Sequence, residues 1–285
     1  MAMKVRVLLS SVVLLSTMWL ISCGHYTCGA TFGNSTCTAA GGGLNQGGGN
    51  NISVTAFLYF VDLGAGQMAA EGLNVSNSQT FHPLTSFVSP TGFVGGEGGM
   101  AVVNKQFLYI AGNSVLNGFL IDPTTGALTA LTGSPHLGIS GLTIAADPQG
   151  RFLFVGGANV IYAFTINVDG SLTVVSGSPF SNANGTPTQL VTDGAGKYLY
   201  ALNGATIEEY SYNQTNGILS TIAGTPFPAG MSMIASEKTG TYLLGITGAT
   251  SEISTFTIGA GGALSGGSQT PTGLPPIFLN SAAAS

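Results

Sequence analysis

A repeat of about 45 residues constrains the fold of this chain more than any other feature of its sequence. A short cluster with the pattern aromatic–Leu–aromatic, or a close variant of it, recurs 44 to 50 residues apart. The five clusters begin at Phe57, Phe107, Phe152, Tyr198 and Tyr242. A period of this length is typical of proteins built from repeated supersecondary units.

Each repeat contains turn and strand signals in a fixed order. Three clusters follow a turn that begins with an acidic residue five positions earlier: Asp147, Asp193 and Glu237. Alternating apolar and polar residues follow, as in residues 160–166, and indicate a half-buried strand. A second turn and a Gly-Ser-Pro or Gly-Thr-Pro motif complete the unit. We interpret each unit as four short strands.

Four strands in 40–50 residues predict a blade of a β-propeller, whose faces are buried between neighbouring blades. The fold class is therefore predicted to be all-β, with five blades. Near the C-terminus, residues 276–280 resemble the first strand of a unit, whereas the repeats begin at a second strand. We expect this C-terminal strand to complete the first blade and close the ring. A truncated or diverged seven-bladed propeller is the alternative.

The units resemble the lactonase-type (YVTN-like) β-propeller repeats of secreted and lipid-anchored bacterial proteins. Segments such as FLYIAGN and ADPQGRFLFVGGANVIYAFTINVDGSLTVVSGSPF carry this resemblance, which extends over most of residues 56–280. It implies the fold and leaves the activity open, since one fold serves many functions.

The first 22 residues are expected to be a lipoprotein signal peptide. Lys4 and Arg6 precede an uncharged apolar run over residues 7–21, as in secretory signals. Residues 20–23, Leu-Ile-Ser-Cys, resemble a lipobox, which implies cleavage before Cys23 and attachment of lipid to its thiol. Several acyl chains on one residue give stable membrane anchoring. With Gly24 next to the cysteine, the resemblance implies an extracytoplasmic protein held at the bacterial outer membrane.

Residues 23–38 are expected to form a tether, and residues 39–55 a Gly-rich linker to the propeller at 56–285. Cys28 and Cys37 remain as a pair in an oxidising compartment and predict a disulfide. The alternative is a zinc site that also uses Cys23 and His25, although its spacing fits no common zinc motif. A haem-attachment motif is missing from the sequence, and we expect no cofactor and no metal.

Charge is scarce and excludes one class of partner. Charged residues make up 6% of the chain, and only four cations remain after the signal peptide is removed. Nucleic-acid binding requires clustered Lys and Arg, so we expect no nucleic-acid partner. The expected partners are the membrane, through the lipid on Cys23, and an unidentified protein or carbohydrate ligand. We expect the protein to be a monomer.

Residues that depart from the repeat are the candidate ligand contacts. His136 replaces the Phe of other units, while Glu208 and Glu209 replace Tyr162 and Ala163 on a strand. Because successive strand residues face opposite sides, the two glutamates are predicted not to act as a pair. The recurring acids Asp122, Asp147, Asp193 and Glu237 are instead predicted to hold turns. Any site is expected at a mouth of the central channel.

No combination of a base with an oxyanion-binding cation is visible, so no catalytic residue is assigned. The function predicted from the sequence is a lipid-anchored binding or surface-display module. The alternative is a periplasmic lactonase-type hydrolase, which rests on the family resemblance. A lectin-like propeller is a third interpretation.

Overall fold

In the computed structural model, the part of the chain that is described consists entirely of strands and their connections. The described residues are 56–62, 67–74, 80–83, 99–112, 114–141, 143–247 and 252–271. Over these ranges there is no helix that could cross a membrane. The cysteines at positions 23, 28 and 37, and with them the predicted lipid site and disulfide, lie outside the described residues.

The strands form five antiparallel sheets in chain order, as the repeat predicts. The first sheet contains β1 (Ala56–Asp62), β2 (Gln67–Asn74) and β3 (Thr80–Pro83). The second contains β4 (Met100–Val103), β5 (Phe107–Gly112), β6 (Val115–Ile121), β7 (Leu128–Ala130) and β8 (His136–Leu137). The third contains β9 (Thr143–Ala146), β10 (Phe152–Gly157), β11 (Val160–Ile166), β12 (Leu172–Val174) and β13 (Phe180–Ser181).

The fourth sheet contains β14 (Gln189–Thr192), β15 (Tyr198–Leu202), β16 (Thr206–Tyr212), β17 (Leu219–Thr221) and β18 (Phe227–Pro228). The fifth contains β19 (Met233–Ser236), β20 (Tyr242–Thr247), β21 (Glu252–Ile258) and β22 (Leu264–Pro271). Sequential pairing within each sheet is the arrangement of a propeller blade. We number the blades one to five in this order.

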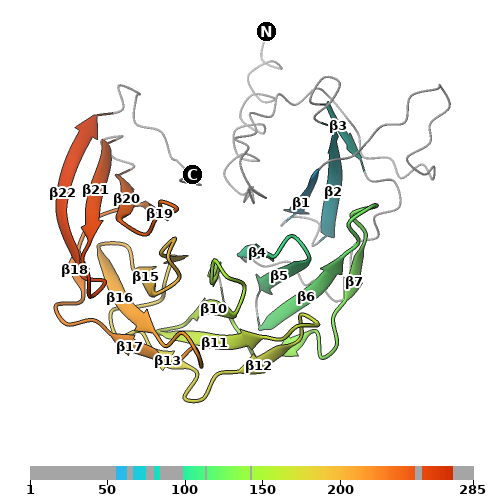
Figure 1. The fold of residues 1–285 in the computed structure, drawn as a ribbon, viewed down its shortest axis with the longest axis horizontal. Coiled ribbons are helices and arrows are strands. Elements are labelled where there is room, and N and C mark those ends of the chain that lie inside the picture. The colour runs from blue at the N-terminus through green and yellow to red at the C-terminus, as the bar shows by residue number, and fades with distance from the viewer. Residues whose placement is uncertain are drawn as a thin grey trace, which may run out of the picture.

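The five blades follow one another around a central axis (Figure 1). The first strands of blades two to five, β4, β9, β14 and β19, contact one another in series and form the inner wall. Among the described residues the arc is open between blade five and blade one (Figure 1). The predicted closing strand, residues 276–280, lies outside the described part, so closure stays a prediction.

The connections divide between the two ends of this arc. We call one end the turn face: it carries the turns joining first to second and third to fourth strands of each blade. We call the other end the loop face: it carries the loops joining second to third strands and those leading from one blade to the next. Both definitions follow from the antiparallel order of the strands.

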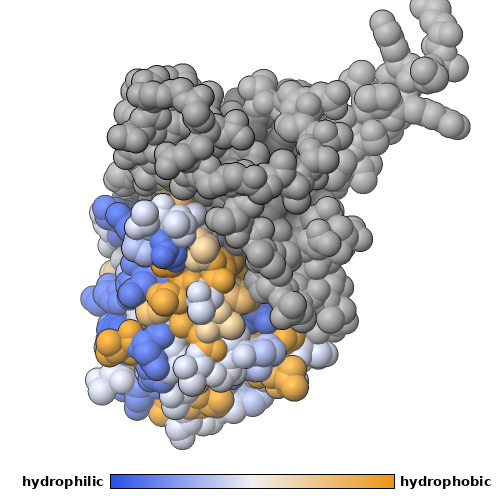
Figure 2. All heavy atoms as spheres, turned by 90° about the vertical axis from the view of Figure 1, so that its right-hand side faces the viewer, coloured by the Kyte–Doolittle hydropathy of each residue, from blue (hydrophilic) through white to orange (hydrophobic). Residues whose placement is uncertain are grey.

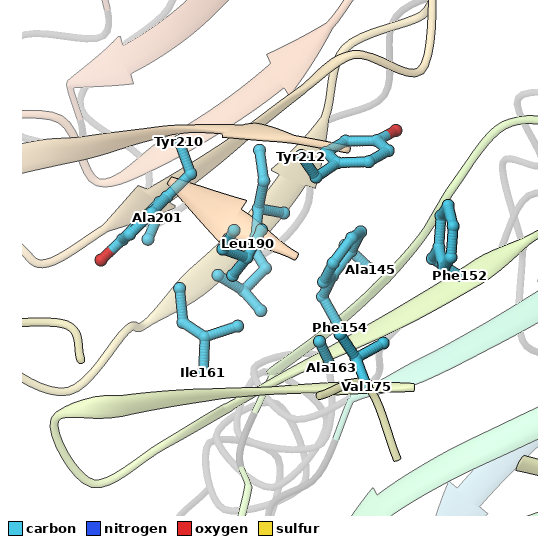
Figure 3. Packing of buried hydrophobic residues seen from close by; sticks show 12 residues of the cluster. Ala145, Phe152, Phe154, Ile161, Ala163, Val175, Leu190, Ala201, Tyr210 and Tyr212 are labelled. Atoms are coloured by element: carbon cyan, nitrogen blue, oxygen red, sulfur yellow. The ribbon is translucent and has the colours of Figure 1, made fainter. Parts of the chain in front are cut away.

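The core lies between the blades rather than within them. Every residue of β5 and of β10 is buried, because each of these second strands is covered on both sides. Between blades three and four, Phe154 and Ile161 pack with Leu199 and Tyr210, and Figure 3 shows the side chains of this cluster pointing toward one another. Removing such apolar surface from water stabilises the stacking of the blades.

The Gly-Ser-Pro and Gly-Thr-Pro motifs interrupt the fourth strand of blades two, three and four. Each interruption removes a ladder partner from a third-strand amide, and the hydroxyl before the proline accepts that amide instead. Ser134 Oγ accepts from Gly118 N at 2.8 Å, Ser178 Oγ from Ala163 N at 2.9 Å, and Thr225 Oγ1 from Glu209 N at 2.8 Å. The motif thus satisfies a backbone donor that would otherwise be left unpaired.

Tyrosine hydroxyl groups connect neighbouring blades at all four junctions between the five described blades. Tyr59, Tyr109 and Tyr200 each donate to a glycine carbonyl in the following blade's turn between third and fourth strands, at 2.6 to 2.8 Å. Blade three has Phe154 at this position. There, Tyr212 of blade four donates to Asp147 of blade three at 2.8 Å. Buried phenols need such partners, and the partners link neighbouring blades.

Candidate functional site

The acidic residues of the turn face are bonded to the backbone of their own turns. Asp193, which is fully buried, accepts bonds from the amides of Ala195 at 3.2 Å, Lys197 at 2.6 Å and Tyr198 at 2.7 Å. Short carboxylate side chains commonly hold turns in this way. The prediction that these acids serve the turns is confirmed.

The remaining turn acids show the same bonding. Asp122 accepts the amides of Thr124 and Thr125, both at 2.8 Å, and these bonds lower its pKa. Burial alone would raise the pKa of Glu237, but bonds from Thr239, Thr241 and Tyr242 lower it to about 2. A carboxylate stabilised in this way is a poor general base, because it gives up its bonds to take a proton.

The guanidinium group of Arg151, like the turn carboxylates, has its hydrogen bonds satisfied by the protein. Its Nε donates to Asp147 at 2.7 Å, and its Nη2 donates to Asp147 at 2.8 Å and to the Gly196 carbonyl at 3.1 Å. Its Nη1 donates to Gln214 Oε1 at 3.0 Å. The guanidinium therefore links the turns of blades three and four and has each of its nitrogens bonded to protein.

All Lys and Arg residues of the described ranges lie on the turn face, one in each of blades two to five: Lys105, Arg151, Lys197 and Lys238. The turns that carry them follow one another closely. Gln149 Nε2 donates to the Ala195 carbonyl at 3.3 Å, and Gly194 N donates to Ser236 Oγ at 3.2 Å. Lys105 and Asp122 are among the residues that line a pocket in blade two, but the carboxylate of Asp122 already accepts the amides of its own turn.

His136 lies in β8, where it packs against blade three. Its ring is tilted against the ring of Phe164, with 6.0 Å between the centroids. Partial burial lowers its pKa, which favours the neutral imidazole. Its place in the packing corresponds to that of Phe180 and Phe227 in the next two blades.

Glu208 lies in β16 and faces blade three. Its side chain is buried, with 3% exposed. Its two carboxylate oxygens accept the amides of Ala183 and Asn184, each at 3.3 Å. These amides belong to the loop 182–188 that leads from blade three to blade four, so Glu208 holds this loop.

Glu209 follows it in β16 and faces blade five. It is 2% exposed, and its Oε1 accepts the amide of Leu264, the first residue of β22, at 2.6 Å. Burial raises its pKa, while the bond from Leu264 lowers it in part. The two glutamates therefore lie on opposite faces of one strand, as predicted. The structure places His136, Glu208 and Glu209 between three different pairs of blades and does not bring them together.

The sequence reading missed a polar cluster that surrounds Glu208. Asn182, fully buried, donates to Asn203 Oδ1 at 2.9 Å and accepts from the Tyr210 hydroxyl at 3.0 Å. Tyr210 also donates to the Ser181 carbonyl at 2.9 Å. Asn203 Nδ2 is buried and has no protein partner. A signal was present, because Tyr210 stands where blades two, three and five have Phe.

Along the inner wall, side chains bond across the neighbouring first strands of blades three, four and five. The amide group of Gln189 donates to the Ile234 carbonyl at 2.9 Å and accepts the Ile234 amide at 2.8 Å. Thr143 Oγ1 accepts the Leu190 amide at 3.0 Å. Over the described ranges, no three His, Cys, Asp or Glu residues gather in a way that could hold a metal ion.

No protein-family model and no curated protein matches this sequence. Solved structures do resemble the fold. One is described as a "putative 6-phosphogluconolactonase" from Bacteroides uniformis, with a TM-score of 0.60 and 17% identity over 76% of this chain and 67% of that chain. A structure of the same description from Bacteroides fragilis has a TM-score of 0.55 and 18% identity over 76% of this chain and 66% of that one.

A third structure, of a protein from Lactobacillus plantarum, has a TM-score of 0.57 and 14% identity over 77% of this chain and 69% of that chain. The chain thus spans about two thirds of the length of each. At these identities the likeness concerns the fold alone. The β-propeller architecture of this chain is therefore similar to the fold of these three structures.

Proposed function

We propose that this chain is an extracytoplasmic β-propeller, anchored to the bacterial outer membrane through lipid on Cys23, that binds a ligand without hydrolysing it. The observation that carries this proposal is the bonding of the ionisable side chains. Asp147, Asp193 and Glu237 hold turns, Arg151 links two blades, and Glu208 holds a loop. General acid–base chemistry needs a group that is free to reach a substrate proton.

A lactonase-type hydrolase is the second candidate, and the likeness to structures described as 6-phosphogluconolactonases favours it. Lactone hydrolysis needs a base and a group that stabilises the developing oxyanion. Of the three candidate residues, His136 and Glu209 hold neither a turn nor the loop 182–188, and they lie between different pairs of blades.

The two candidates are separated by assaying the purified mature chain against a panel of lactones that includes 6-phosphogluconolactone. We expect no turnover above the spontaneous rate. Turnover that is lost in His136→Ala or in Glu209→Gln, with the fold retained, would establish the hydrolase and overturn the binding proposal.

The anchor is tested separately in cells. We expect Cys23→Ser, or treatment with globomycin, to block processing and to release the protein from the membrane fraction. Unchanged processing and partition would show that Cys23 is not the anchor. One mass measurement without reduction tests the proposed bond between Cys28 and Cys37, since a disulfide lowers the mass by the two thiol hydrogens.

A further inference from the structure

Among the connections that join blades two to five, the loop 182–188 is the longest. It has seven residues, whereas the connections before and after it have five (138–142) and four (229–232). Connecting loops on a rigid scaffold are the usual carriers of binding function. Its length therefore makes this loop a candidate for ligand binding on the loop face.

The loop is also held more firmly than its length would suggest. At its start, Asn182 N donates to the Asn159 carbonyl of blade three at 2.9 Å, and its side chain bonds to Asn203 and Tyr210 of blade four. Glu208 accepts the next two amides. At its end, Thr188 N donates to the Leu202 carbonyl at 2.8 Å. Fixing a loop before binding lowers the entropy that the complex would otherwise lose.

The residues that hold the loop are departures from the repeat. Glu208 stands where blades two, three and five have Asn117, Tyr162 and Ser254, and Tyr210 where they have Phe. Asn182 corresponds to Gly138 and Ala229. Burying these polar groups is costly unless each is bonded, so they are a poor choice for packing alone. Their shared contact is the loop 182–188.

The side chains that the loop presents to solvent are uncharged, and all of them except that of Ala183 are polar. Ala183, Asn184, Thr186 and Thr188 are exposed, whereas Asn182 and Pro187 are buried. The described loop face of blades two to four contains no Lys or Arg, and its one carboxylate, Glu208, is buried. Large exposed apolar side chains are scattered: Leu120, Leu137, Val168, Val174 and Tyr242. Figure 2 shows apolar and polar residues interspersed over the described part of one side of the arc.

This chemistry narrows the class of ligand. A phosphorylated or acidic ligand needs cationic side chains or clustered amide donors. The described loop face of blades two to four has no cationic side chain. A protein partner is usually held by aromatic and arginine anchors, and the loop has neither. Amide and hydroxyl groups pair well with hydroxyl groups, which both donate and accept.

We propose that the loop 182–188 is the recognition loop of this propeller and that it binds a neutral saccharide through Asn184 and Thr186. This inference rests on the proposed binding function and names its ligand class. Glu208 acts as a positioning residue: it holds the loop and does not touch the saccharide.

The test is binding of the mature chain to an array of neutral and acidic glycans, followed by titration calorimetry with the best neutral oligosaccharide. We expect the double variant Asn184→Ala, Thr186→Ala to weaken binding at least tenfold without lowering the melting temperature. Ser140→Ala, in the corresponding loop 138–142, is the matched control and is expected to bind as the wild type does. Glu208→Ala should weaken binding, and Glu208→Gln, which keeps one acceptor oxygen, should restore part of it.

Binding that is unchanged in the double variant, or a preference for acidic glycans, would overturn the inference. Absence of glycan binding by the folded wild type would overturn the saccharide class and leave a non-hydrolytic binding function standing. Lactone turnover would instead overturn the proposed function itself.

Discussion

The turn face and the loop face of the arc use polar residues in opposite ways. On the turn face, carboxylates such as Asp193 and Glu237 satisfy the amides of tight turns, and all the described Lys and Arg lie beside them. On the loop face of blades two to four, the exposed polar side chains are neutral amides and hydroxyls. In a chain with 6% charged residues, charge therefore marks the places where the fold is held.

The difference has a simple physical origin. A tight turn directs several amides toward one point, and a carboxylate there can accept all of them at once. Longer connections meet their needs through backbone carbonyls and neighbouring side chains, as Asn182 and Thr188 do. Charged residues on the turn face are thus required by the turns, whereas residues exposed in the loops are free to serve a ligand.

Replacing a turn carboxylate should have the largest effect on stability. Asp193→Ala leaves the amides of Ala195, Lys197 and Tyr198 without their carboxylate acceptor, and we expect it to lower the free energy of unfolding by about 3 kcal/mol. Thr186→Ala on the loop face is the matched control, with an expected change within about 0.5 kcal/mol. Urea unfolding followed by fluorescence measures both.

Equal losses in these two variants would contradict the distinction between the faces. So would an Asp193→Asn variant that is as stable as the wild type, because Asn keeps one acceptor oxygen without the charge.

Two tyrosine contacts between blades test whether a charged acceptor stabilises the fold more than a neutral one. The expected losses in free energy of unfolding are smaller than for Asp193→Ala. Tyr212→Phe removes a hydrogen bond to the carboxylate of Asp147, and we expect a loss of about 2 kcal/mol, since bonds to charged groups are the stronger ones. Tyr200→Phe removes a bond to the neutral Gly262 carbonyl and should cost about 1 kcal/mol. The two variants remove the same atom and leave both rings in place.

A larger loss for Tyr200→Phe than for Tyr212→Phe would show that burial, and not the charge of the acceptor, sets the strength of these contacts. Thermal unfolding monitored by circular dichroism at one protein concentration is sufficient for this comparison.

The sequence was sufficient for the features that are local and repeated. The strand clusters and the turn acids recur within one unit, so each copy supports the interpretation of the others. The opposite orientation of Glu208 and Glu209 followed from strand geometry alone. These are the parts of the fold that depend on residues a few positions apart.

Contacts between units could not be read in the same way. Glu209 meets Leu264, 55 residues later, and Tyr212 meets Asp147, 65 residues earlier. The polar cluster at Asn182 depends on blades three and four together. The departures from the repeat were visible, but whether they serve a ligand or another blade depends on packing that the spacing does not contain.

The smallest expected effect is a difference in the pH dependence of stability between two glutamates. Glu209 is buried between blades, whereas Glu237 holds a turn on the turn face. Burial raises the pKa of Glu209, so the stability it contributes is complete below its unfolded pKa of about 4.3 and is lost as pH rises through its folded pKa. The pKa of Glu237 is lowered to about 2, so its contribution is present above about 4.3 and is lost as pH falls toward 2.

The two Gln variants should therefore differ from the wild type in opposite pH ranges. The melting temperature of Glu209→Gln should rise relative to that of the wild type as the pH is raised from about 4 to 8. Glu237→Gln should be less stable than the wild type at neutral pH, with the difference shrinking on acidification. Parallel differences at all pH values would show that neither carboxyl group titrates with folding, because only a pKa that changes on folding makes stability depend on pH.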